Sequence, residues 1–226
     1  MKSFFRVVFC KFRRKLCTGF CLLLLAPTFA VASVCPGDAD LAARCPVEIG
    51  KAIDAADTVA FEKLVDTGAI LNTALNTFLR DPEAMQATGN VPPLLALVFS
   101  RAATQDAAGE RVRKILINEA KAFVLNGISS GAFAGRPPAG PAAGGLLAPI
   151  FADASTGRKE IREIGRPRPQ GEEWIVPFVV YDAGNGETYP VLGRVTPMEG
   201  HFRLTAVENL DELVLRVNGE RENQEE

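Results

Sequence analysis

Residues 173–207 read EWIVPFVVYDAGNGETYPVLGRVTPMEGHFRLTAV, and this stretch decides the fold. Residues 173–181 are apolar on both faces, which predicts a strand, although Pro177 favours an edge position or a bulge. Asn185-Gly186 predicts a hairpin turn, and Glu199-Gly200 predicts another turn. Apolar side chains alternate along the two strands that these turns introduce: Tyr189, Val191 and Val195, then Phe202, Leu204 and Ala206. With a weaker strand over residues 158–166, we expect a curved antiparallel sheet of three to four strands.

Helical patterns fill the chain before this sheet. Apolar residues recur at helical spacing in five segments, which predicts helices over residues 47–56, 58–65, 70–79, 94–103 and 107–127. Asp57 and Asp106 stand where N-caps are expected, and Gly127 stands where the longest helix should end. Helices that precede an antiparallel meander indicate an α+β fold, with N-terminal helices packed on the C-terminal sheet. Between the two halves, residues 131–149 are rich in Gly, Ala and Pro, which predicts a mobile loop.

The N-terminus has the order of a secretory signal. Six basic residues precede an uncharged, leucine-rich core over residues 16–26, and Pro27 follows. Ala30-Val31-Ala32 then supplies the small residues that a signal peptidase requires, which predicts cleavage before Ser33. We expect a signal peptide over residues 1–32 and a periplasmic or secreted protein.

Three alternatives to this signal remain open. Residues 16–34 are uncharged and just long enough to span a bilayer as a retained anchor. Cys35 would be the modified residue of a lipoprotein, although Val34 before it is larger than expected. Arg13-Arg14 would belong to a twin-arginine signal. Membrane association is expected only if the signal is uncleaved, and the domain would then still face outward.

Charge limits the partners of the exported part. The chain has 25 basic and 27 acidic residues, and six of the basic ones lie in the signal, which leaves 19 against 27 and a formal charge of −8. Such a charge disfavours nonspecific binding to nucleic acid or to anionic lipid. We therefore expect no nucleic-acid partner.

For the organisation of the chain, we expect one α+β domain over residues 47–217 and a polar tail over residues 218–226.

Two cysteines remain after the signal is removed. Cys35 and Cys45 are an even number in an oxidising compartment, which predicts a disulfide that ties residues 33–46 to the first helix. A metal site is not expected, because the two thiols lack close spacing and the single His201 is distant. The spacing is also not the Cys-x-x-Cys of a redox pair.

Short stretches at both ends of the domain carry a resemblance to a known family. Residues 54–57 (DAAD), 61–66 (FEKLVD) and 70–72 (ILN) resemble the helical opening of uncharacterised bacterial secreted or membrane-tethered proteins. Residues 200–205 (GHFRLT) resemble that family's closing strand, where an aromatic and an apolar residue follow a turn. The family is grouped with the nuclear transport factor 2-like, cone-shaped α+β folds. The resemblance implies this fold over residues 47–217, but such folds host isomerases, dehydratases, binding proteins and assembly modules, so it implies no single function.

An enzyme on a cone-shaped fold would need an acid–base pair in its pocket, and the candidates are Tyr181, Asp182, Tyr189 and His201. We interpret Asp182 as a turn residue, the two tyrosines as a cross-strand pair, His201 as exposed, and Trp174 as a core or pocket-wall aromatic. Because the sequence has no nucleophile motif, metal cluster or nucleotide loop, we expect no catalytic, cofactor or metal-binding residue. We therefore expect a non-catalytic protein that binds a small apolar ligand or an envelope protein in a concave pocket. An isomerase or hydrolase on the same fold is the alternative.

Overall fold

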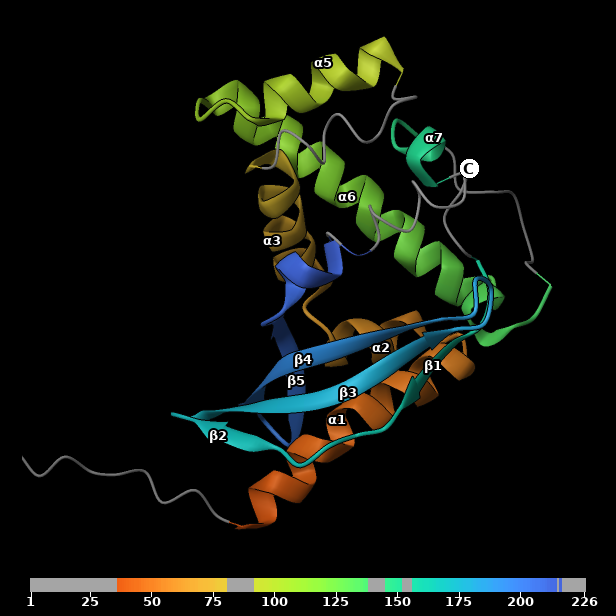
Figure 1. Ribbon diagram of the computed structural model, residues 1–226, viewed down its shortest axis with the longest axis vertical. Helices are drawn as coiled ribbons and strands as arrows, with labels where there is room; N and C mark the ends of the chain where they lie inside the picture. Colours follow the sequence, from red (N-terminus) through yellow and green to blue (C-terminus); the bar gives the residue numbers. More distant parts are fainter. Residues whose placement is uncertain (1–35, 81–91, 138–144, 152–155, 215, 217–226) are drawn as a thin grey trace, which may run out of the picture. The chain divides into compact units, whose positions relative to one another are not determined.

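The computed structural model describes residues 36–80, 92–137, 145–151, 156–214 and 216. Helices come first along the chain: α1 (Pro36–Asp54), α2 (Thr58–Leu64), α3 (Thr67–Arg80), α5 (Pro93–Ala102), α6 (Ala107–Ser129), the short 3-10 helix η1 (Ala132–Ala134) and α7 (Ala148–Phe151). The strands follow: β1 (Lys159–Arg162), β2 (Arg168–Gln170), β3 (Glu173–Asp182), β4 (Glu187–Met198) and β5 (His201–Val207). This order confirms the predicted α+β fold with helices ahead of an antiparallel sheet (Figure 1).

The sheet has five strands in the order β1-β3-β4-β5, and β2 also pairs with β3. The predicted turns at Asn185-Gly186 and Glu199-Gly200 are confirmed, and both glycines have positive φ, at 78° and 75°. The short strand β2 was not predicted, because RPQ has no apolar alternation.

Pro177 lies in the central strand β3, so the edge position that it suggested is wrong. β1 pairs with residues 179–182 and β2 pairs with residues 173–175, so neither strand pairs with Pro177. The carbonyl oxygen of Pro177 accepts a hydrogen bond from Gly165 N at 2.8 Å, within the link between these two strands. The backbone N and O of one strand residue point to the same side of the strand. The nitrogen of Pro177, which carries no hydrogen, therefore faces the link between β1 and β2, where neither strand pairs with it. The chain therefore accommodates the proline by breaking the neighbouring strand.

Helix α1 begins at Pro36, eleven residues before the predicted start at Val47. Pro46 lies inside it and is fully buried. A proline in a helix interior removes a backbone hydrogen bond and usually ends the helix, which is why the sequence pattern placed the boundary there. Residues 36–46 are thus part of the domain and not a separate N-terminal segment.

The extent of α1 bears directly on the predicted disulfide. Cys35 lies outside the described residues, and the structure shows Cys45 as a free, buried thiol. Pro36 and Cys45 are nine steps apart in one helix, which separates their Cα atoms by about 13 Å. A disulfide needs Cα atoms about 4.4–6.8 Å apart, and the single step of about 3.8 Å from Pro36 to Cys35 cannot close that gap. A bridge would therefore require the first turns of α1 to unwind.

Two caps occur where the sequence predicts them, but one predicted helix end is wrong. Asp57 accepts a hydrogen bond from Ala60 N, and Asp106 accepts from Ala108 N and Gly109 N. Gly127 does not end α6, which continues to Ser129. It is buried instead against the ring of Phe133, where a Cβ would lie 2.7 Å from Cε1.

The predicted loop over residues 131–149 is partly regular, since η1 and the start of α7 lie in it. Residues 138–144 are outside the described part.

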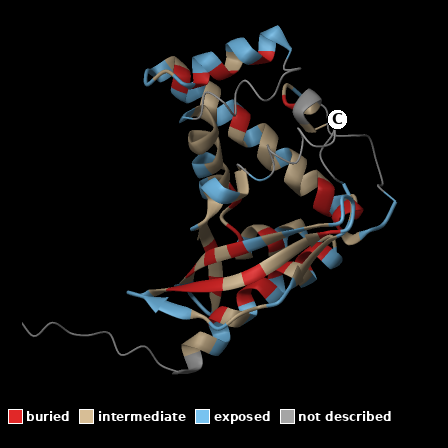
Figure 2. Cartoon of the chain, in the orientation of Figure 1, coloured by how far each residue is buried: buried red, intermediate tan, exposed pale blue. Residues whose placement is uncertain are grey.

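Buried side chains form two clusters. The larger cluster joins α1, α2 and the end of α6 to one face of the sheet, and its members include Ile49, Phe61, Trp174, Val176 and Leu204. The smaller cluster joins α3, α5, α6 and residues near α7. Figure 2 shows the buried residues concentrated along the strands and α1, while α3 is mostly of intermediate exposure. The buried side chains thus divide between the sheet with α1 and α2 and the helices α3, α5 and α6.

Candidate functional site

A groove of about 610 Å³ lies between α1 and the end of the sheet where β2 meets β3 and β4 meets β5. From α1 it is lined by Asp38, Leu41, Cys45 and Glu48, whose spacing of three and four residues places them on one helix face. The opposite wall comes from the two strand turns and from Trp174 and Phe202. This volume is in the range of ordinary ligand pockets, about 300–1,000 Å³.

Apolar side chains form the walls of the groove. Trp174 and Phe202 are 6 % and 9 % exposed and make its floor. Leu41 and Met198 stand at its mouth, are 48 % and 40 % exposed, and come from α1 and from β4, on opposite walls of the groove. The groove therefore leaves apolar surface in contact with water on both the helix side and the sheet side.

Charged groups surround this apolar surface. Three carboxylates, Asp38, Glu48 and Glu172, line the groove against one guanidinium, Arg44. Glu48 forms an exposed ion pair with Lys51 at 2.8 Å. Asp38, Arg44 and Glu172 make no ion pair with another residue of the described ranges. Three carboxylates against Arg44 and Lys51 leave one negative formal charge at the rim.

Cys45 lies at the inner end of the groove but is not built to react. Its Sγ donates to the carbonyl oxygen of Phe202 at 3.5 Å, and the residue is 3 % exposed. Burial raises the pKa of this thiol from 9.0 to about 12, so the side chain stays neutral at physiological pH. Because the thiolate is the nucleophilic form, Cys45 acts as a small apolar core residue here.

The structure does not bring the four candidate acid–base residues together. Tyr181 is opposite Thr188, whereas Tyr189 is opposite Val180. Directly opposed residues share a face and successive residues alternate, so the two tyrosines lie on opposite faces of the sheet. The predicted cross-strand pair is therefore wrong.

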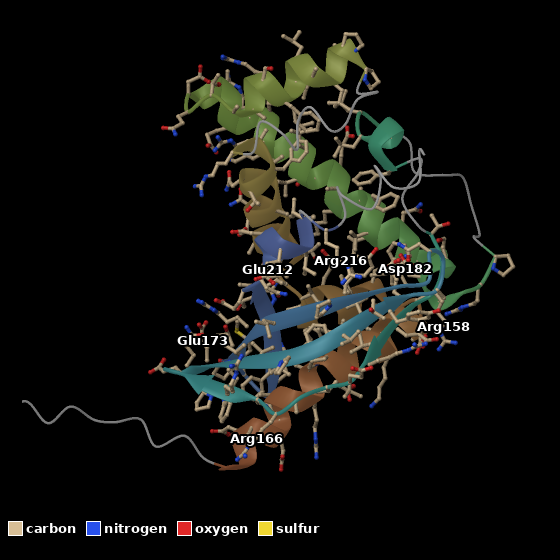
Figure 3. All side chains as sticks on the ribbon, in the orientation of Figure 1. Arg158, Arg166, Glu173, Asp182, Glu212 and Arg216 are labelled. Carbon is tan, nitrogen blue, oxygen red and sulfur yellow. The ribbon has the colours of Figure 1, made fainter. Side chains whose placement is uncertain are left out.

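The other two candidates lie at opposite ends of the sheet. Asp182 ends β3 at the hairpin, while Glu173 marks the far end of the same strand, close to the groove (Figure 3). His201 lines the groove at that far end, where a ring nitrogen is 3.1 Å from the carbonyl oxygen of Glu199. It is half-buried rather than fully exposed as expected. Of the four candidates, the groove thus contains only His201.

Asp182 is a structural residue as well as a turn residue. It is 6 % exposed, and its Oδ2 accepts from the Lys159 ammonium at 2.6 Å. Its Oδ1 accepts from Gly184 N at 2.9 Å, which is the turn contact that the sequence predicts. Burial lowers the pKa of Lys159, although the hydrogen bond and the charge of Asp182 oppose the shift. The pair therefore fixes β1 to the end of β3.

The sequence alone predicts only some of the residues that line the groove. Trp174 was expected as a core or pocket-wall residue, and it is both. Leu41, Arg44 and Met198 were missed. The helical spacing of Leu41, Cys45 and Glu48 would have shown one face of a helix, but Pro46 within this pattern concealed it.

Within the described ranges, no three His, Cys, Asp or Glu side chains gather in a way that could hold a metal ion. Across those same residues, no helix combines the length and the apolar character needed to cross a membrane.

The fold defines this protein as an α+β domain whose helices precede a five-stranded antiparallel sheet. Comparison with protein-family models, with curated proteins and with solved structures found no match to this chain. The resemblance to the nuclear transport factor 2-like family stays a prediction, which rests on the stretches within residues 54–72 and 200–205.

Proposed function

We propose that this protein is an exported, non-catalytic binding module whose groove takes an apolar group that carries a positive or neutral polar end. The observation that carries the proposal is the groove itself, with Leu41 and Met198 exposed above a floor of Trp174 and Phe202. Covering such surface contributes roughly 25 cal/mol per Å² of apolar area removed from water. The occupant is either a small apolar ligand or an apolar segment of an envelope protein.

The charge of the rim favours a cationic end. With Glu48 paired to Lys51, the carboxylates of Asp38 and Glu172 against the Arg44 guanidinium leave one negative charge, which attracts positive charge and disfavours an anionic head group. The excess of acidic residues over the whole exported part acts in the same direction. A basic amphipathic segment and an apolar amine share this chemistry.

A non-catalytic role is supported by the chemistry of the groove. Its thiol is neutral and buried, and His201 is the only one of the four acid–base candidates that lines it. A general base must lie within hydrogen-bond reach of its target and of the groups that assist it. The alternative isomerase or hydrolase would therefore have to pair His201 with a groove carboxylate, Asp38, Glu48 or Glu172, and among the described residues His201 makes no hydrogen bond to any of them.

The export part of the proposal is supported by the sequence of residues 1–32, whose basic head, apolar core and Ala30-Val31-Ala32 site have the order of a signal peptide. This pattern supports a periplasmic or secreted location.

Capture from envelope extracts tests the binding function. Purified protein should retain an apolar ligand or a partner, and a Leu41→Ser, Met198→Ser variant should lose it. A Leu94→Ser, Leu97→Ser variant is the matched control, because those leucines on α5 are 66 % and 67 % exposed but do not line the groove. Equal retention by both variants, or no retention by any form, would count against the proposal.

A further inference from the structure

His201 is the only histidine in the chain, and it lines the groove at the start of β5. The turn over Glu199 and Gly200 places it there, and one ring nitrogen lies 3.1 Å from the carbonyl oxygen of Glu199. The residue is half-buried, so protons from the solvent can reach its ring. Histidine is the residue type that ordinarily changes its charge between about pH 8 and about pH 5. Among the described residues that line the groove, His201 is the only one of this type.

The charged groups that face His201 come from α1 and from the turn between β2 and β3. They are Asp38, Arg44 and Glu48 on the helix and Glu172 in the turn. Because Glu48 is paired with Lys51, the remaining two carboxylates against one guanidinium leave one negative charge in the groove. Helix α2 adds only the apolar Leu64 to the lining, and the thiol of Cys45 stays neutral over this pH range.

A proton on His201 is not neutralised by a neighbouring carboxylate. Among the described residues, His201 forms no ion pair, and its ring nitrogen contacts a backbone carbonyl oxygen. Arg203, two residues further along β5, is paired with Asp66 at 3.5 Å. Protonation of His201 therefore adds one positive charge to the groove and brings its formal charge from minus one to zero.

We propose that His201 is a pH switch: when His201 gains a proton, the groove releases a ligand that carries a positive charge. This inference rests on the proposed function, since it requires the groove to bind an apolar group with a positive end. The physical cause is the repulsion between like charges in one groove. One added unit charge should weaken the binding of a cation by roughly three- to tenfold at the effective dielectric constant of a protein surface. A neutral ligand should be unaffected, because the charge of the imidazole has nothing to repel.

Isothermal titration calorimetry with decylamine and decanol tests the switch on the chain purified with whatever N-terminus it carries. Decylamine stays cationic at about pH 8 and about pH 5.5, because an alkylamine loses its proton only at about pH 10, and decanol stays neutral. The dissociation constant of decylamine should be about three to ten times larger at the lower pH. The dissociation constant of decanol should be the same at the two pH values. The pH effect on decylamine should shrink in roughly 0.5 M salt, because salt screens the repulsion.

Three substitutions of His201 assign the effect to this side chain. His201→Asn and His201→Gln stay neutral, so each should bind decylamine with one affinity at both pH values. His201→Lys stays charged at both pH values, so it should bind decylamine weakly throughout and should still bind decanol.

The switch is overturned if the wild type binds decylamine equally at both pH values, if decanol weakens together with decylamine, or if the neutral variants keep the pH dependence. Loss of decanol binding in both neutral variants would also overturn it, because His201 would then hold the shape of the groove. A wild type that binds neither probe at either pH would contradict the proposed function itself, and the switch would fall with it.

Discussion

The Lys159 ammonium lies 2.6 Å from the Asp182 carboxylate, and this buried contact joins the first strand of the sheet to the end of its central strand. The two side chains are 19 % and 8 % exposed, and the ring of Phe133 lies 5.3 Å from the same ammonium. The pair thus links the sheet to the segment after α6, at the end of the sheet away from the groove.

Replacing Asp182 with Asn should lower the free energy of unfolding by about 3 kcal/mol, because it removes the charge opposite a mostly buried cation. The amide keeps the oxygen that accepts from Gly184 N, so the turn itself is preserved. Chemical denaturation measures the change. Asp211→Asn is the control, since its contact with Thr77 is exposed and should be worth less than about 1 kcal/mol. Equal effects of the two substitutions would show that the Lys159–Asp182 pair is not the stabilising feature.

Gly127→Ala should destabilise the protein by about 1–3 kcal/mol, because the new methyl group overlaps the buried ring of Phe133. The same substitution at Gly68, in the first turn of α3, has room and should be neutral or stabilising by up to about 1 kcal/mol. Thermal unfolding of the two variants compares them directly. A stabilising Gly127→Ala would mean that Phe133 does not pack on α6 in this way.

These positions show what the sequence could predict and what it could not. An apolar run located β3, which is buried on both faces at Trp174, Ile175 and Val176, and alternation located β4 and β5. The turns were predictable because they need glycine at positive φ. Pro46 and Pro177 misled the prediction, since local rules treat proline as a breaker, whereas burial holds the first in a helix and a gap between strands accommodates the second. Gly127 was mistaken for a helix end, because its contact with Phe133 is a tertiary one.

The candidate site was the least predictable part. One residue of register decides the face of a strand, so Tyr181 and Tyr189 seemed to form a pair although they lie on opposite faces. The groove joins α1 to turns more than 120 residues later in the chain. A single sequence does not encode such a contact in any local pattern.

Cys45 should make stability fall at alkaline pH. Its folded-state pKa is about 12 against an ordinary 9.0, so its contribution is complete below pH 9.0 and is lost as the pH rises toward 12. Near pH 10.5 the loss should be about 2 kcal/mol, at 1.36 kcal/mol per pKa unit. Denaturation of the wild type and of Cys45→Ala at about pH 8 and about pH 10.5 isolates this thiol. A difference between the two proteins that does not change with pH would contradict it.

The same thiol gives a test of the N-terminal disulfide. In the folded protein, α1 should keep Cys45 unreactive toward an alkylating reagent and unbridged to Cys35. Non-reducing mass spectrometry would show a bridge as a loss of two hydrogens. Such a loss would mean that the first turns of α1 unwind in the exported protein.

The N-terminus of the exported protein should be Ser33. Edman sequencing or terminal-peptide mass spectrometry of protein from its native compartment decides this. A chain that begins at Met1 would indicate a retained anchor, and a lipid on Cys35 would indicate a lipoprotein.

Fluorescence of Trp174 tests the central claim most directly, because it is the only tryptophan in the chain and forms the floor of the groove. Titration with decylamine should change its emission in a saturable way and at lower concentration than decanoate, since the rim is acidic. The response should be lost in Leu41→Ser, Met198→Ser and kept in Leu94→Ser, Leu97→Ser. An unchanged emission at saturating probe, or a response that survives loss of Leu41 and Met198, would contradict a binding role for the groove.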